Sequence, residues 1–290
     1  MTLAWPDASG WGAWPGAWGP GGPGRPPGGA PRRMAASTGP YQGAHGLRER
    51  LSPGWRRGVR RVADAALGPL LGSIKGFSTD LPLVALTFDD GPDPEGTRAV
   101  LEALADHGAK ATFFLLSSRA ERHPDICQQI VSSGHQVGFH GPEHRSLRGE
   151  PFTLVREKMA KGLRSLEAAS GVRVDLFRPP FGAQSLASYL AARSLGLEVV
   201  VWATMARDWE AAPYWQLADS AVAGVLPGDI VLLHDAFEPG PRGPSQPPVI
   251  DRHQVTAEVC QRLRERNLTS VSIRELAASG KAVRTAWFRP

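Results

Sequence analysis

Residues 83–93 decide the fold class, and they read Leu83-Val84-Ala85-Leu86-Thr87-Phe88-Asp89-Asp90-Gly91-Pro92-Asp93. The apolar first half has the length and the β-branched and aromatic content of a buried strand. Two adjacent aspartates and a Gly-Pro turn then end it. A buried strand that stops at paired carboxylates predicts a sheet with polar chemistry at one edge.

Outward from this stretch, short apolar runs alternate with helix-length amphipathic segments, which is the pattern of parallel β/α units. The further predicted strands are 111–116, 136–140, 174–178, 198–203, 229–234 and 268–273. The predicted helices include 97–107, 124–133, 153–170, 185–195 and 255–266. This alternation is compatible with a closed barrel or an open doubly wound sheet. The first strand is not followed by a Gly-rich phosphate loop, which weighs against a nucleotide-binding sheet.

The N-terminal part differs in composition from the rest. Of the first 40 residues, 10 are Gly and 8 are Pro, so this stretch suits neither a helix nor a regular strand. We therefore predict a disordered, low-complexity extension over 1–50, followed by a basic amphipathic linker or helix over 51–80, the main folded domain over 81–280 and a C-terminal tail over 281–290. Residues 81–290 carry 23 basic and 24 acidic residues, a balance that argues against nucleic acid as a partner.

The stretch from Trp55 to Ile74 is basic and partly amphipathic. It suits a membrane-surface helix or, because Gly68 and Pro69 interrupt it, a short helix that docks on the main domain. Neither a secretory signal nor a transmembrane run of 18 apolar residues can be read in the sequence. Localisation is therefore left open.

Polar side chains collect at the predicted carboxyl ends of the strands, which is the edge that carries active sites in β/α barrels. They are Asp89 and Asp90 after the first strand, His140 and His144 after the third, Arg178 at the fourth, Asp208 after the fifth and His234 at the sixth.

Asp90, His140 and His144 are the predicted metal ligands. Two imidazoles and one carboxylate leave an open coordination position for water, as in catalytic zinc sites. A solvated loop is the alternative for the histidine pair alone. Asp89 is then free to act as general base; the alternative is a turn in which both aspartates only cap the next helix, the role that we expect for Asp93.

His234 ends an apolar strand and suits a general acid, because imidazole titrates near neutrality. The alternative is a core histidine without a catalytic role. We expect structural roles for His107, His123 and His135. The two cysteines, Cys127 and Cys260, lack the spacing of a zinc or disulfide framework, and we expect both to be buried core thiols.

Taken in order, these segments resemble the polysaccharide deacetylases of carbohydrate esterase family 4. The resemblance extends over roughly residues 81–276. It rests on 87–92, the His140/His144 pair, Arg178-Pro179-Pro180-Phe181-Gly182, Asp208-Trp209, Leu232-Leu233-His234 and the similar segment 108–114.

The resemblance implies a distorted (β/α)7 barrel and metal-dependent removal of N-acetyl groups from a peptidoglycan-type or chitooligosaccharide-type carbohydrate. It implies one divalent metal ion, zinc in most of the family, with cobalt or another ion as alternatives. It gives Arg178 the role of holding Asp89, and Asp208 that of orienting His234. The backbone N–H of Phe181 would stabilise the oxyanion, and Trp209 would line the acetyl pocket.

Two positions depart from the family pattern. Gly141 stands where a Ser or Thr usually follows the first metal histidine, so a supporting hydroxyl is absent, and such losses typically cost ~10 to 100-fold in metal affinity. Met205 stands where an Asp is frequent. A catalytically weak carbohydrate-binding homologue therefore stays open as an alternative, as do an O-acetyl esterase and a cyclic-amide hydrolase on the same barrel.

Overall fold

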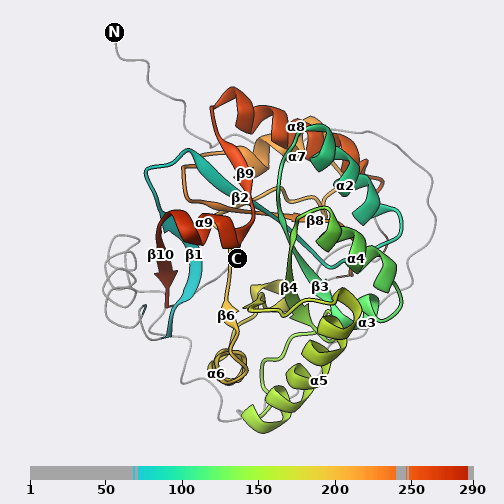
Figure 1. The fold of residues 1–290 in the computed structure, drawn as a ribbon, viewed down its shortest axis with the longest axis vertical. Coiled ribbons are helices and arrows are strands. Elements are labelled where there is room, and N and C mark those ends of the chain that lie inside the picture. Colours follow the sequence, from blue (N-terminus) through green and yellow to red (C-terminus); the bar gives the residue numbers. More distant parts are fainter. Residues whose placement is uncertain (1–67, 69–70, 240–245, 247, 287–290) are drawn as a thin grey trace, which may run out of the picture. The chain divides into compact units, whose positions relative to one another are not determined.

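The computed structural model describes residue 68 and residues 71–239, 246 and 248–286 (Figure 1). Its centre is a parallel sheet with the pairing order β6-β5-β4-β3-β2-β8-β7, and β9 pairs with the first residues of β2 and bonds Lys110, just before β3. The strands are β2 (Leu83–Asp89), β3 (Thr112–Leu116), β4 (Gln136–Gly141), β5 (Leu176–Phe177), β6 (Glu198–Val199), β7 (Thr204–Met205), β8 (Ile230–His234) and β9 (Thr269–Val271).

The helices follow the strands along the chain, and α2, α4 and α8 pack along one side of the sheet in Figure 1. They are α2 (Gly96–Asp106), α3 (Ser117–Ala120), α4 (Pro124–Ser132), α5 (Phe152–Ser170), α6 (Leu186–Ser194), α7 (Tyr214–Val222), α8 (Arg252–Glu265) and α9 (Ile273–Ser279), together with the 3-10 turn η1 (Pro180–Gly182). The predicted α/β class and barrel-like architecture are confirmed.

The sheet is curled. β6 and β7 lie at opposite ends of the pairing order, yet they are consecutive in sequence. The segment from Val199 to Thr204 spans at most about 18 Å when fully extended, so the two ends of the sheet must approach each other. Residues 198–203, predicted as one strand, therefore divide between β6 at one edge and a crossing segment that leads to β7 at the other.

A two-stranded antiparallel ribbon lies at this opening. It consists of β1 (Ser73–Ser78) and β10 (Lys281–Thr285). The backbone N–H of Val201 donates to the carbonyl of Ile74 at 2.8 Å, and that of Phe77 donates to Gly228 at 2.8 Å. β1 thereby bonds to the segment after β6 and to the segment before β8. The ribbon thus lies across the opening between the two ends of the sheet.

The ribbon corrects two sequence-based boundaries. Residues 51–80 were expected to form a linker or helix, but 73–78 form β1, and 281–285 of the expected tail form β10. The pairing register of β1 shifts between Ile74 and Gly76, and such a bulge breaks strict alternation. Ile74 and Phe77 are consequently three residues apart, a spacing that imitates a helix. β10 is mostly exposed and so has little apolar pattern.

Ile74 is 5% exposed, so this end of the predicted membrane-surface stretch is buried in the protein. Residues 55–67 of that stretch, and the whole 1–50 extension, lie outside the described residues. Among the residues that the structure describes, no helix is long and apolar enough to cross a bilayer.

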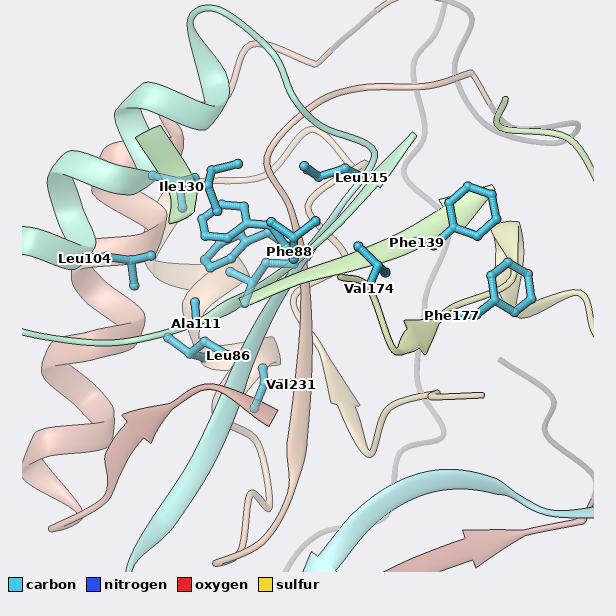
Figure 2. Packing of buried hydrophobic residues seen from close by; sticks show 14 of the residues in the cluster. Leu86, Phe88, Leu104, Ala111, Leu115, Ile130, Phe139, Val174, Phe177 and Val231 are labelled. Carbon is cyan, nitrogen blue, oxygen red and sulfur yellow. The ribbon is translucent and has the colours of Figure 1, made fainter. Parts of the chain in front are cut away.

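The core has two layers because side chains alternate along each strand. Val84, Leu86 and Phe88 of β2 face the helices and join the larger apolar cluster. Figure 2 shows Phe88 between Leu104 and Ile130 on one side and the Phe139–Phe177 pair on the other. Ala85 instead belongs to a second cluster inside the half-barrel, with Phe114. The buried free thiols Cys127 and Cys260 lie in the outer cluster, as predicted.

Candidate active site

The same alternation selects the side chains of the site. Phe139 and Phe177 pack in the outer cluster, so the next residues, His140 and Arg178, turn toward the interior. Asp89 is likewise two residues beyond Thr87 on the inner face of β2, where Oδ1 of Asp89 and the hydroxyl of Thr87 contact the same guanidinium nitrogen. β2, β4 and the end of β5 thus place polar side chains at one end of the half-barrel interior.

Three donor atoms converge there. Oδ1 of Asp90 lies 3.3 Å from Nε2 of His140 and 3.3 Å from Nε2 of His144. One ligand atom from each of these residues lies within 4.8 Å of the other two. Oδ1 of Asp90 is buried and makes no hydrogen bond in the described chain, a costly state that a bound cation would relieve. The donor set therefore fits a divalent metal ion.

Local backbone structure aims these donors. Asp90 adopts a φ of 81°, a conformation that costs a non-glycine residue about 1–3 kcal/mol. It lets Asp89 and Asp90 point in different directions although they are adjacent. Nδ1 of His140 lies 2.8 Å from the carbonyl of Arg178. A carbonyl only accepts, so Nδ1 carries the proton and Nε2 is left as the ligand atom.

Asp89 is held by a buried arginine. Nη1 of Arg178 donates to Oδ1 of Asp89 at 2.7 Å and to the hydroxyl of Thr87 at 2.8 Å. Arg178 is fully buried, and its guanidinium carbon lies 4.1 Å from the ring centroid of Phe114. The ion pair orients the carboxylate and leaves its other oxygen, Oδ2, 3.8 Å from Nε2 of His140.

His234 and Asp208 form a second pair. Nδ1 of His234 lies 2.7 Å from Oδ1 of Asp208, and the backbone N–H of His234 donates to Oδ2 at 2.7 Å. The carboxylate thus fixes both the backbone and the ring of His234. The ring of Trp209 lies edge-on to that of His234 at a centroid distance of 5.5 Å.

The pKa values follow from this arrangement. Burial would lower the pKa of His234, but the charge of Asp208 and its hydrogen bond outweigh it and raise the pKa to about 9. Burial would raise the pKa of Asp90, yet the close contact with the His140 ring and the charges of the nearby imidazoles lower it to about 2. Burial lowers the pKa of His144 to about 4, so His144 is neutral at pH 7, as a metal ligand must be.

Phe181 lies beside the predicted metal ligands. Its ring centroid is 4.1 Å from that of His144. Phe181 sits in η1 with a φ of 58°, a left-handed conformation that is uncommon for a bulky residue. Backbone strain of this kind clusters at binding and catalytic sites.

The two departures from the family pattern have local explanations. Gly141 has a φ of 111°, which L side chains rarely adopt, so the backbone after His140 takes a path that suits glycine. Met205 packs against the inner apolar cluster and pairs with Leu232 of β8. Apolar packing thus occupies this position in place of a charge.

The residues given structural roles mostly behave accordingly. Oδ1 of Asp93 accepts from the backbone N–H groups of Glu95 and Gly96 at 3.1 and 2.8 Å and holds the turn before α2. Nδ1 of His135 accepts from Ala111 at 3.2 Å. Burial lowers the pKa of His135 to about 4, so its ring is neutral.

Two polar residues of the site were not singled out from the sequence. Thr87 bonds both Arg178 and the carbonyl of Val231, and its signal is a hydroxyl within an apolar strand. Asp235 directly follows His234, is fully buried and accepts from the backbone N–H of Gly91 at 3.0 Å. Burial raises the pKa of Asp235 to about 7, and the hydrogen bond from Thr97 opposes that rise.

Comparison with known proteins places this geometry in context. The family described as polysaccharide deacetylase matches residues 78–200. A chitooligosaccharide deacetylase of Azorhizobium caulinodans is 34% identical over 171 residues, which are 59% of this chain and 81% of that protein.

Solved structures are similar over a longer part of the chain. The Bc1960 peptidoglycan N-acetylglucosamine deacetylase, in complex with an N-hydroxybenzamide compound, superposes with a TM-score of 0.63 at 26% identity and covers 72% of this chain and 94% of that one. BA3943 of Bacillus anthracis, described as a pseudoenzyme of the CE4 family, superposes with a TM-score of 0.64 at 23% identity, covering 74% and 72%. The latter likeness concerns the fold alone.

Proposed function

The chain belongs to carbohydrate esterase family 4, the polysaccharide deacetylases, which hydrolyse carbon–nitrogen bonds, and from this premise we propose that it removes N-acetyl groups from an amino-sugar polymer or oligosaccharide. The observation that carries the proposal is the convergence of Asp90, His140 and His144 beside an arginine-held carboxylate, Asp89.

Asp90, His140 and His144 would hold the metal ion, for which we propose zinc because two nitrogens and one carboxylate are a common catalytic zinc set. Once bound, a divalent cation would polarise the acetyl carbonyl and increase the acidity of water at the site. The hydrogen bond from His140 to the Arg178 carbonyl fixes the ring for this role, and the neutral state of His144 keeps a lone pair available.

Asp89 would act as general base. Its Oδ1 is occupied by Arg178 at 2.7 Å, so the proton of the attacking water passes to Oδ2. The fixed carboxylate requires no reorganisation when the proton moves, which is the advantage of a positioned base. The backbone N–H of Phe181 would donate to the oxygen on which negative charge develops.

His234 would act as general acid. Its pKa of about 9 keeps the ring protonated at neutral pH, and Asp208 holds the Nδ1 side. The Nε2 proton is then available to the amine nitrogen as the carbon–nitrogen bond breaks. Trp209, edge-on to the His234 ring, would form one wall of the pocket for the acetyl methyl group.

The proposed substrate class is an N-acetylglucosamine polymer of the peptidoglycan or chitooligosaccharide type. Similar proteins named above act on one or the other. The amide preference rests on His234: an amine is a poor leaving group unless it is protonated as it departs, whereas an alkoxide from an O-acetyl ester depends less on an acid.

The test is acetate release by purified protein that has been stripped with a chelator and reloaded with zinc or cobalt. Substrates are N-acetylglucosamine oligomers, peptidoglycan and, as the ester control, O-acetylated xylan. We expect metal-dependent acetate from at least one of the two N-acetylated substrates and little from xylan.

Three outcomes would contradict the proposal. Faster release from xylan than from either amide would indicate an O-acetyl esterase. Stoichiometric metal with no acetate from any substrate, but with binding of the oligomers, would indicate a carbohydrate-binding homologue. Equal turnover by Asp89→Asn, with metal still bound, would exclude the proposed base.

A further inference from the structure

Asp235 is a buried carboxylate that the proposed reaction does not use. It follows the general acid His234 at the end of β8, and its side chain is enclosed. Oδ1 accepts from the backbone N–H of Gly91 at 3.0 Å, and Oδ2 accepts from the hydroxyl of Thr97 at 2.5 Å. Its own backbone N–H donates to the carbonyl of Asp89 at 3.2 Å.

These hydrogen bonds hold the Asp89–Gly91 turn, which carries the proposed base and one proposed metal ligand. The carbonyl of Asp89 and the N–H of Gly91 flank Asp90, so residue 235 holds the chain immediately before and after that ligand. Thr97 links Asp235 to a later part of the turn, because its hydroxyl also accepts from the N–H of Asp93 at 2.7 Å. The turn is thereby held at several points by the residue that directly follows β8.

The packing at this contact is tight. A Cβ on Gly91 would lie 2.0 Å from Oδ2 of Asp235, so glycine is needed for the carboxylate to reach the backbone. On the other side, a Cβ on Gly96 would lie 2.1 Å from the carbonyl of Asp235. The neighbouring Arg252 donates through Nε to the carbonyl of His234 at 3.2 Å. Residues 234 and 235 are thus held by α2 and α8 as well as by β2.

Burying the carboxylate of Asp235 costs free energy, which its hydrogen bonds must offset. Burial raises the pKa of Asp235 to about 7, which means that folding works against its charge. An apolar residue here would avoid that cost but would leave the Gly91 N–H without its acceptor. The strained Asp90, with a φ of 81°, needs surroundings that over-determine its conformation, and Asp235 supplies them.

We propose that Asp235 is a positioning residue that locks the Asp89–Gly91 turn to the end of β8, so that the ligand Asp90 and the base Asp89 keep a fixed register with the acid His234. This inference rests on the proposed function, because it assigns Asp235 a role in the same metal site. Asp235 acts through Gly91 and Thr97.

The experiment compares zinc affinity, measured by competition with a chromophoric chelator, in the wild type and in Asp235→Ala, Asp235→Asn and Thr97→Val. Asp235→Ala removes both side-chain bonds, and we expect it to lower zinc affinity by about 10 to 100-fold, as loss of a group that orients a ligand does. Asp235→Asn keeps an acceptor for Gly91 and should restore most of the affinity. Thr97→Val, which spares the Gly91 bond, should fall between these two.

Further readouts separate positioning from simple stability. We expect the visible spectrum of cobalt-loaded Asp235→Ala to differ from that of the wild type, and kcat to fall more than KM rises. A lower melting temperature with unchanged zinc affinity, cobalt spectrum and kcat per folded molecule would overturn the inference and leave the proposed function intact.

Asp235→Glu keeps the test decisive if the alanine variant does not fold. It retains the charge but moves the carboxylate by one methylene, so we again expect weaker zinc binding. Wild-type affinity and spectrum in Asp235→Glu would overturn the inference. Absence of zinc binding by the wild type would instead overturn the metal site, and this inference with it.

Discussion

The two sides of the half-barrel are built differently. β2, β3, β4 and β8 have five to seven residues each and pair in parallel, continuously between β2 and β8 and with a register shift at His140 between β3 and β4. β5, β6 and β7 have two residues each. The proposed base and two metal ligands belong to β2 and β4 or follow β2 directly. Arg178, Phe181, Asp208 and Trp209 follow the short strands.

The difference lies in what fixes the side chains. On the long-strand side, the backbone ladder between β2 and β8 sets where Asp89 points, and His140 lies at the β3–β4 register shift, where its ring bonds the carbonyl of Arg178. On the short-strand side, side chains anchor themselves to backbone across the interior: Asp208 accepts from the N–H of His234, and Arg178 donates to the carbonyl of Val201. Regular pairing thus holds the proposed base, and individual hydrogen bonds hold the groups of the short-strand side.

The largest expected effect concerns the long-strand side. Asp89→Asn removes the proposed base while keeping its shape, so kcat for acetate release should fall by about 10² to 10⁴-fold. The metal content of the purified variant, measured by atomic emission, should stay at the wild-type level. A fall of less than tenfold would show that the ladder-held carboxylate is not the base.

The second prediction concerns Arg178, on the short-strand side, and its ion pair with Asp89. Arg178→Met should lower the free energy of unfolding by about 3–5 kcal/mol, because it leaves Asp89 as an unpaired buried charge. Denaturant titration measures this value. The control is the double variant Asp89→Asn/Arg178→Met, in which the stranded charge is absent and part of the stability should return. A loss below about 1 kcal/mol in the single variant would contradict the account.

The third prediction concerns the pH dependence. An acid must be protonated to act, so kcat/KM should fall as pH rises through the His234 pKa of about 9. Asp208 is the main cause of that raised pKa, so Asp208→Asn should move the basic limb toward the ordinary value of 6.5 and lower the maximum. Rate profiles from pH 5 to 10 measure the limb, and an unmoved limb would exclude Asp208 as the cause.

The smallest effect is expected at Gly141, where the long-strand side departs from the family pattern. Gly141→Ser supplies the usual hydroxyl but places a side chain at a φ of 111°, which should cost about 1–3 kcal/mol of stability. Thermal unfolding and zinc affinity measure the two effects. A stable variant with tighter zinc binding would show that the hydroxyl matters more than the backbone path.

The same contrast explains how much could be predicted from the sequence. β2 and β8 are apolar runs with both faces buried, so their ends, and with them Asp89 and His234, could be located by pattern alone. The runs 174–178 and 198–203 located β5 and β6 but not their two-residue length or the position of β7, and β1 is concealed by its bulge between Ile74 and Gly76. The hydrogen bond between Asp235 and Gly91 joins residues 144 apart in sequence. It depends on the order of the strands in the sheet, which local periodicity does not encode.

The central claim is that one metal ion, held by Asp90, His140 and His144, is required for hydrolysis of an N-acetyl group. The most direct measurement is a zinc titration of the stripped protein, with acetate release from the preferred N-acetylglucosamine substrate recorded at each addition. We expect activity to rise linearly and to saturate at one zinc per chain. Full turnover without metal, or none after one equivalent has bound, would contradict the claim.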